Sequence, residues 1–307
     1  MTGEFMMKVS GLTKRYGETR AVDGISFTVP NASVFTILGP NGAGKTTTLE
    51  MLEGIREPDS GEIEMFGSRM KRVSRSVKQR MGVLLQEGGF EPYLKVHEIL
   101  RLFASLFKKS LPIDDILEWV SLSEKAKALV RTLSGGQKQR LAIGAALIND
   151  PDFVFLDEPT TGLDPQARRN IWDIVSTLKA RGKTIILTTH YMEEAEALSD
   201  EVCIMDYGKI IAQGTPKTLT DDLGEETLIE FRGEDVPSQA MDQLLRCCKA
   251  TRSDQMMITL ETEHLADTME SLFAWSREHE IKLRDLTVRQ PNLEDVFLTL
   301  TGRRLRG

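Results

Sequence analysis

The stretch that decides the fold is Gly39-Pro40-Asn41-Gly42-Ala43-Gly44-Lys45-Thr46. The apolar run from Val34 to Leu38 leads into it, and a helix-compatible stretch that begins near Lys45 leads out of it. Glycines let the loop curl so that successive backbone N–H groups point inward, and the following helix adds the positive end of its dipole. Lys45 can then reach the β- and γ-phosphates of a nucleotide, and the hydroxyl of Thr46 can bind Mg²⁺. We therefore interpret the stretch as a nucleotide phosphate site rather than as a glycine turn with a solvated lysine.

Length and composition describe an ordinary globular protein. The chain has 307 residues, enough for one large α/β domain and a smaller one. Hydrophobic residues make up 40% and charged residues 28%, as in soluble globular proteins. The formal charge of −7, without a dominant basic block, argues against nucleic acid as the main partner.

The sequence favours a cytoplasmic protein. Cys203, Cys247 and Cys248 have no C-x-x-C spacing, so we expect reduced thiols. No run approaches the roughly 18 apolar residues that a membrane span needs. The N-terminus lacks the basic-then-apolar pattern of a secretory signal. If the protein serves a membrane process, we expect it to act from the cytosolic side through a partner.

Two adjacent carboxylates follow a buried strand. The apolar run Phe153–Leu156 ends in Asp157 and Glu158. Open parallel sheets place ligand groups at the carboxyl ends of their strands. Asp157 suits Mg²⁺, and Glu158 is then left to orient or deprotonate a water molecule. A strand that ends in Asp-Glu is weak evidence alone, but it becomes strong evidence in a chain that has a phosphate loop.

Three further candidate residues lie at strand ends or in turns. Residues 82–86 form an apolar strand that ends at Gln86. The strand Thr184–Thr188 ends just before His190, which is either a structural histidine or a contact for the γ-phosphate. Tyr16, in a turn-rich stretch between two short strands, is either a half-buried loop tyrosine or a side chain that stacks on a base.

Residues 97–149 have a helical pattern that interrupts the α/β order. Within this block, Leu133-Ser134-Gly135-Gly136-Gln137 opens a helix. Ser134 and Gln137 match a capping box, so the stretch can be simply a well-capped helix start. Consecutive glycines, however, are poor helix formers, and they leave the N–H groups of the helix N-terminus bare as a second anion-binding surface.

A boundary near residues 214–226 precedes a second domain, because glycine, proline and acidic residues break the pattern there. Beyond it, strand candidates alternate with helix candidates, as in a small α/β domain of roughly 80 residues. The strands are expected at Leu228–Phe231, Met256–Leu260 and Ile281–Leu286, and the helices at 238–249, 264–279 and 292–300.

Together the motifs resemble the nucleotide-binding subunit of ABC transporters over residues 6 to about 220. The resemblance rests on Walker A (Gly39–Thr46), the Q-loop glutamine (Gln86), the LSGGQ signature (Leu133–Gln137), Walker B with its catalytic glutamate (Phe153–Glu158), the D-loop (Gly162-Leu163-Asp164) and the switch histidine (His190). Tyr16 lies where the adenine-stacking aromatic of the family lies, so the resemblance favours the base-stacking role. Six motifs in family order leave little room for coincidence.

The resemblance implies an α/β fold of the P-loop NTPase class, with a mixed sheet core, an antiparallel β subdomain and a helical signature subdomain at about 97–149. It assigns residues 1–220 to this nucleotide-binding domain and leaves 225–307 as a small accessory α/β domain. It implies ATP binding by Tyr16, Gly39, Pro40, Asn41, Gly42, Ala43, Gly44, Lys45, Thr46, Thr47, Ser134, Gly135, Gly136, Gln137 and Asp164. It further implies Mg²⁺ binding by Thr46, Gln86 and Asp157, and an ATPase reaction catalysed by Glu158, His190 and Gln86.

The resemblance also implies partners. Two cassettes are expected to form an ATP-dependent head-to-tail homodimer, with each ATP between Walker A of one subunit and LSGGQ of the other. The stretch Pro291–Gly302 resembles the C-terminal extension of bacterial drug- and antibiotic-export ATPases of the daunorubicin/bacitracin type. We therefore expect a peripheral subunit on the cytosolic face of the cell membrane. It would energise a separate integral-membrane permease for efflux of a drug-like or other hydrophobic or amphipathic substrate.

Three alternatives compete with export. A soluble ABC ATPase that acts on ribosomes or DNA usually has two cassettes in one chain or long coiled-coil insertions, and the sequence shows neither. An importer subunit would use the tail as a regulatory domain, and the exporter-like stretch 291–302 argues mildly against it. A P-loop kinase does not fit the LSGGQ motif.

Overall fold

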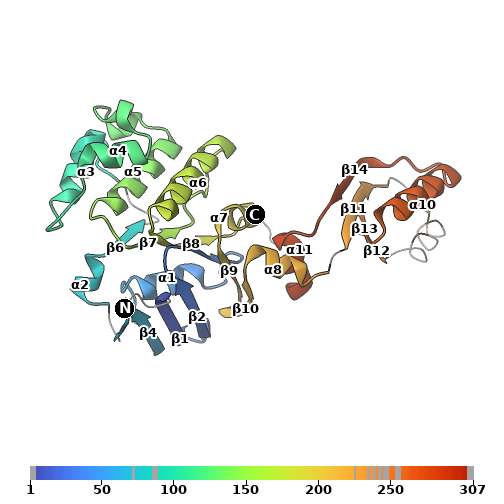
Figure 1. Cartoon of the computed structure of the whole chain (residues 1–307), viewed down its shortest axis with the longest axis horizontal. Helices are drawn as coiled ribbons and strands as arrows, with labels where there is room; N and C mark the ends of the chain where they lie inside the picture. Colours follow the sequence, from blue (N-terminus) through green and yellow to red (C-terminus); the bar gives the residue numbers. More distant parts are fainter. Residues whose placement is uncertain are drawn as a thin grey trace. The chain divides into compact units, whose positions relative to one another are not determined.

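The chain forms two compact units in the computed structural model (Figure 1). Among the described residues, those up to Pro216 form the first unit and those from Lys217 onward form the second. The structure describes residues 5–70, 73–84, 89–224, 226–233, 236–237, 240, 244, 249–252 and 257–302.

A sheet of six described strands forms the centre of the first unit. Across the sheet these are β10 (Lys209–Gly214), β9 (Glu201–Asp206), β3 (Val34–Leu38), β8 (Thr184–Thr189), β7 (Phe153–Asp157) and β6 (Met81–Leu84). The strands from β9 to β6 run parallel, and β10 is antiparallel to β9. The predicted mixed sheet is thus confirmed. All residues of β3, β7 and β8 are buried, because the sheet is covered on both faces.

An antiparallel sheet and one helix cover the first face of the central sheet. The strands are β2 (Thr19–Pro30), β1 (Phe5–Tyr16), β4 (Ser60–Met65) and β5 (Ser68–Met70), in this order, and the helix is α1 (Lys45–Leu52). Phe27 of β2 stacks on Phe35 of β3 with ring centroids 5.0 Å apart, and Phe153 and Phe155 of β7 join the same core. Because β1 continues to Tyr16, the turn around this residue is shorter than the sequence suggests.

Helices cover the other face. The described ones are α3 (Val96–Ala104), α4 (Ile113–Trp119), α5 (Gly135–Leu147), α6 (Pro165–Ala180) and α7 (Met192–Leu198), with short 3₁₀ turns at Ser123–Lys125 and Val130–Thr132. The short helix α2 (Arg75–Lys78) precedes β6, and its Val77 packs against the core of the first face. Helices α3, α4 and α5 gather together in Figure 1, which confirms a helical subdomain. Val154 and Leu156 of β7 point into the core beneath these helices, whereas Phe153 and Phe155 point away from it.

The second unit is a small α/β structure. Its described elements are α8 (Pro216–Asp221), β11 (Thr227–Arg232), β12 (Lys249–Arg252), β13 (Met257–Thr262), α10 (Leu265–Glu278), β14 (Arg284–Arg289) and α11 (Leu293–Thr301). The sheet has the order β12-β13-β11-β14. Trp275 of α10 packs on Phe231 of β11, and its indole N–H donates to the carbonyl of Ala240 at 2.9 Å.

Two predictions for the second unit need correction. The strand expected at Ile281–Leu286 begins only at Arg284, because Ile281 and Leu283 fill the core from the segment before the strand. Ile281 and Leu283 alternate with polar residues because they pack into the core, and not because they belong to a strand. Strand β12 was not predicted, and it includes residue 249, the last residue of the helix expected at 238–249. The rest of that helix falls almost entirely outside the described residues.

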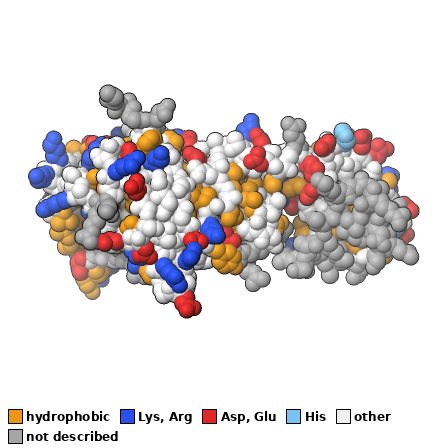
Figure 2. Space-filling model, turned by 90° about the horizontal axis from the view of Figure 1, so that it is seen from below, with side chains coloured by type: hydrophobic (Ala, Val, Ile, Leu, Met, Phe, Trp, Pro, Cys, Tyr) orange, Lys and Arg blue, Asp and Glu red, His pale blue; other side chains and the backbone are white. Residues whose placement is uncertain are grey.

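Charged side chains and the properties of the described helices characterise the exterior of the protein. Basic and acidic side chains are interspersed over the described part of the face in Figure 2. Among the described residues, no helix has both the length and the apolar character that crossing a membrane requires.

Of the three cysteines, the described one is Cys203, which is buried and reduced. Cys247 and Cys248 lie outside the described residues.

Candidate active site

The phosphate loop joins β3 to α1 in a conformation that requires glycine. A Cβ on Gly39 would lie 2.2 Å from the carbonyl oxygen of Met205, and one on Gly44 would lie 2.2 Å from that of Ala21. Gly44 also has φ 105 and caps α1 without a side-chain hydrogen bond, so the N-terminus of this helix faces the loop uncapped. Gly39, Ala43 and Lys45 are buried, Pro40, Gly44, Thr46 and Thr47 half-buried, and Asn41 and Gly42 exposed.

Lys45 points its ammonium back into this loop. The Nζ atom donates to the carbonyl oxygens of Gly39 at 2.9 Å and Pro40 at 3.1 Å. It also lies 3.1 Å from Oε1 of Glu158. Lys45, the first residue of α1, therefore contacts both the phosphate loop and the residue that follows β7. The parallel topology predicts this, because it brings the carboxyl ends of the strands to the same edge of the sheet.

Glu158 is held by contacts on both carboxylate oxygens. Oε1 faces Lys45, while Oε2 lies 3.3 Å from Nδ1 of His190 and accepts a hydrogen bond from the hydroxyl of Thr161 at 3.1 Å. Its backbone has φ 45, a left-handed conformation that is uncommon for a non-glycine residue and recurs at functional sites. Burial raises the pKa of Glu158, but the charges of Lys45 and His190 outweigh burial and hold the pKa below its ordinary value. Glu158 is therefore an ionised carboxylate that is held in one orientation.

Asp157 and Thr46 place oxygen atoms near Glu158. Asp157 is buried and accepts a hydrogen bond from the hydroxyl of Thr188. Burial raises the pKa of Asp157, the hydroxyls of Thr188 and Thr46 oppose this, and the charge of Glu158 adds to the rise. A hydroxyl and a carboxylate at adjoining positions fit Mg²⁺, which proteins bind through one or two such oxygens while phosphates and waters complete the shell.

The other predicted contacts lie in different settings. Gln86 falls outside the described residues. Tyr16 is 40% exposed at the end of β1, and the Arg56 guanidinium lies 5.2 Å from its ring centroid. Asp164 is exposed and caps α6 by accepting a hydrogen bond from the N–H of Ala167 at 2.9 Å.

The LSGGQ stretch forms the capped start of α5. The N–H of Gln137 donates to the Ser134 hydroxyl at 3.3 Å, and Oε1 of Gln137 accepts from the N–H of Ser134 at 3.0 Å. A Cβ on Gly136 would lie 2.8 Å from that of Ala167, so this glycine lets α5 and α6 approach closely. Ser134 and Gly135 are exposed. In the part of the chain that the structure describes, no hydrogen bond joins this stretch to the phosphate loop.

Comparison with known proteins decides the family. The family model described as "ABC transporter" matches residues 22–161. A Nod factor export ATP-binding protein I from Ralstonia nicotianae is 42% identical over 311 residues, which cover 98% of this chain and 95% of the relative. The chain belongs to the ABC transporter ATP-binding family. It is an ATPase of this family by the same comparison, and its motifs stand in the order expected for it.

Two further comparisons agree with this ABC ATPase assignment. The linearmycin resistance ATP-binding protein LnrL of Bacillus subtilis is 38% identical over 310 residues, covering 98% of this chain and 100% of the relative. A solved structure, cbiO1 from Clostridium perfringens, part of the ABC transporter complex cbiONQ, is 29% identical. It superposes with a TM-score of 0.64 and covers 72% of this chain and 92% of that one.

Sequence reasoning missed several residues of the ABC ATPase site. Thr161 and Thr188 hold Glu158 and Asp157, and Glu194 lies buried behind them. The threonines lie within three residues of recognised motifs, which is a usable signal. Glu194 gives no such signal, because it stands in the acidic run Glu193–Glu196 that predicts a solvated helix face.

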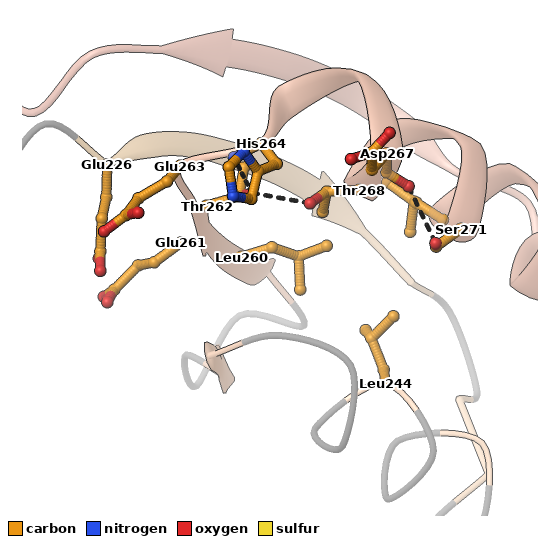
Figure 3. A pocket seen from close by; sticks show the side chains of 11 residues that line it. Glu226, Leu244, Leu260, Glu261, Thr262, Glu263, His264, Asp267, Thr268 and Ser271 are labelled. Atoms are coloured by element: carbon orange, nitrogen blue, oxygen red, sulfur yellow. Dashed lines mark hydrogen bonds between the residues drawn. The ribbon is translucent and has the colours of Figure 1, made fainter.

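A hollow of about 380 Å³ lies in the second unit, away from these motifs in the sequence. Figure 3 shows acidic side chains around it, above Leu260 and Leu244. The hydroxyls of Thr262 and Thr268 share a hydrogen bond of 2.7 Å, and Ser271 donates to the carbonyl of Asp267 at 2.9 Å. These hydroxyl groups are therefore engaged in hydrogen bonds within the second unit.

Proposed function

We propose that this chain is the ATP-binding subunit of an exporter, which binds Mg·ATP and energises a separate integral-membrane permease. The observation that carries the proposal is the cluster of Lys45, Glu158 and His190 at the phosphate loop. Relatives that match nearly the whole chain support export, because their names state Nod factor export and linearmycin resistance. The cargo is assigned, as part of this proposal, to drug-like or other hydrophobic or amphipathic molecules.

The arrangement of charges suggests how hydrolysis begins. ATP places its β- and γ-phosphates against the loop N–H groups and the Lys45 ammonium. The phosphate oxygens compete with Glu158 for this ammonium, which releases the carboxylate to accept a proton from the attacking water. His190, which lies on the other oxygen of Glu158, would contact the γ-phosphate. Thr46, Gln86 and Asp157 would hold Mg²⁺, and the bound ion would supply positive charge to the phosphate oxygens.

A head-to-tail homodimer completes the site in this proposal. The chain has two anion-binding elements, the phosphate loop and the exposed start of α5. The described residues of these two elements share no hydrogen bond, so a second subunit is the natural source of the LSGGQ contacts of Ser134, Gly135, Gly136 and Gln137. ATP between the two surfaces would hold the subunits together.

The two parts of the chain receive different tasks. Residues 1–220 would form the nucleotide-binding domain, and residues 225–307 an accessory domain that adds dimer contacts. The whole subunit would lie on the cytosolic face of the cell membrane, attached through its permease.

An apolar groove in the first unit is the proposed permease contact. It has a volume of about 380 Å³ between the central sheet and the helical subdomain, next to the loop that follows Gln86. Val83, Phe90, Phe103, Leu106 and Phe107 line it, and Phe90 meets Phe103 edge-on with ring centroids 5.8 Å apart. Leu106 is 68% exposed, so a partner side chain could bury substantial apolar area there.

Cell fractionation tests this proposal. The wild-type chain is expected in the membrane fraction when the permease gene is expressed with it, and not with ribosomes. Leu106→Glu is expected to release it, whereas Leu102→Glu, an exposed leucine of α3 outside the groove lining, is expected to leave it bound. Cofractionation with ribosomes would favour the soluble alternative. An equal loss for both variants would exclude the groove as the contact.

A further inference from the structure

A fully buried carboxyl group lies behind the active site and has no place in the mechanism described so far. Glu194 of α7 has no exposed surface. Its Oε1 accepts a hydrogen bond from the indole N–H of Trp172 in α6 at 3.1 Å, while Oε2 lacks a partner of good geometry. Burial raises the pKa of Glu194, and the hydroxyls of Thr189 and Thr160, the indole of Trp172 and the charge of Arg168 oppose this rise.

The groups around Glu194 come from the segments that carry the reacting side chains. Thr160 stands two residues after Glu158, and its carbonyl accepts from the N–H of Leu163 in the D-loop at 3.2 Å. Thr189 directly precedes His190, and its hydroxyl accepts from the N–H of Tyr191 at 3.0 Å. Glu194 is therefore the common neighbour of the loop after Glu158 and the end of strand β8.

A second set of contacts joins the same two segments. The Tyr191 ring lies against the His190 ring, with centroids 4.1 Å apart, and the Arg168 guanidinium lies 4.3 Å from the centroid of Tyr191. Arg168 also donates from Nε to the carbonyl of Leu163 at 3.1 Å. The D-loop and the histidine are thus connected through α6 as well as through α7.

From this arrangement we infer that Glu194 is a positioning residue for ATP hydrolysis, which fixes the D-loop and His190 relative to Glu158 through Thr160, Thr189 and Trp172. Among the described residues, no hydrogen bond or ion pair joins Glu194 to the phosphate loop or to Lys45. The loss of Glu194 is therefore expected to slow the chemical step and to leave ATP binding intact. Small displacements of catalytic groups are sufficient for a loss of rate.

Steady-state kinetics of the full chain with Mg·ATP tests this inference. Glu194→Ala is expected to lower kcat by about 10- to 100-fold, a range typical of displaced catalytic groups, with KM for ATP unchanged. Glu194→Gln is expected to restore most of the rate, because the amide keeps the shape and still accepts from Trp172. Glu193→Ala, an exposed acid on the same helix, is the matched control and should retain wild-type kinetics.

Thr160→Val covers the case in which Glu194→Ala does not fold, since it removes only the buried hydroxyl that faces Glu194 and keeps the shape of the side chain. It should lower kcat in the same direction with unchanged KM and melting temperature. The inference is overturned by a folded Glu194→Ala or Thr160→Val variant with wild-type kcat. It is also overturned by a loss of ATP affinity that matches the loss of rate, or by Glu194→Gln being as slow as Glu194→Ala.

Discussion

The ammonium of Lys45 and the carboxylate of Glu158 form a buried ion pair, with Nζ 3.1 Å from Oε1 and side chains that are 4% and 11% exposed. One residue begins α1 and the other follows β7, so the pair exists only because the parallel sheet brings both strand ends to the same edge. The same ammonium is expected to face the β- and γ-phosphates. ATP binding and the release of the Glu158 carboxylate are therefore linked through a single side chain.

Lys45→Ala is expected to reduce ATP turnover by at least about 100-fold, since it removes a preorganised charge that faces the phosphates. The pKa of Glu158 should rise at the same time, because Lys45 makes the largest contribution that lowers it. Phosphate release measures the turnover of ATP, and nucleotide binding with Mg²⁺ present measures the affinity. Lys127→Ala, an exposed lysine, is the control. Near wild-type hydrolysis by Lys45→Ala would contradict the interpretation of residues 39–46 as a phosphate site.

Glu53 predicts a pH dependence of stability. Its side chain is 6% exposed at the end of α1, and burial, with the charges of Asp157 and Glu50, raises its pKa from 4.5 to about 8 against the opposing charge of Lys78. Between these two values the folded state holds a proton that the unfolded state has lost. This contribution therefore stabilises the fold below pH 4.5 and is lost as pH rises to about 8. Its slope is at most about 1.4 kcal/mol per pH unit.

Urea unfolding from pH 5 to pH 9, without nucleotide or Mg²⁺, measures this slope. Glu53→Gln is expected to flatten the profile and to be more stable than wild type at pH 8, because a neutral amide has no ionisation to suppress. Glu18→Gln, an exposed acid, should keep the wild-type slope. A Glu53→Gln profile that is parallel to wild type would show that this carboxyl does not titrate abnormally.

Arg289 connects three elements of the second unit. From β14 it forms paired hydrogen bonds to Glu230 of β11, at 2.9 and 3.1 Å, and to Asp295 of α11, at 2.6 and 2.9 Å. Arg289→Lys keeps the charge but cannot form both forks, and should destabilise the second unit by about 1–2 kcal/mol, given the partial exposure of the pair. Arg277→Lys on the surface of α10 is the control in thermal unfolding. Equal stability of the two variants would contradict the role of Arg289.

The phosphate loop could be predicted because its chemistry is local. Gly39 and Gly44 are required because the loop passes close to the carbonyl oxygens of Met205 and Ala21, and the spacing of the motif encodes both glycines. The strand ends at Glu158 and His190 could also be placed, since parallel strands of apolar residues have one functional edge. Which oxygen of Glu158 faces Lys45 and which faces His190 could not, because this depends on side-chain packing across distant segments.

Buried carboxyl groups were beyond sequence reasoning for a different reason. Glu53 and Glu194 stand near other acidic residues, and such clusters predict solvent exposure. Glu53 is the C-cap residue of α1 and Glu194 lies in α7, and only the packing shows that these two acids point inward. The same limit explains why the start of strand β14 was predicted too early. The alternation of Ile281 and Leu283 fits a strand as well as it fits a core-filling loop.

Glu158→Gln tests the catalytic base and the dimer together. The change keeps the shape of the side chain but removes the group that accepts a proton, and the loss of a general base typically costs about 10²–10⁴-fold in rate. ATP binding should survive, because Lys45, Thr46 and Asp157 are unchanged. A ligand that binds only the closed state shifts the population toward it, so the variant should accumulate with ATP as a dimer in light scattering. Glu193→Gln should hydrolyse ATP normally. Full activity in Glu158→Gln would remove it from the catalytic role, and an ATP-loaded monomer at high concentration would argue against the head-to-tail arrangement.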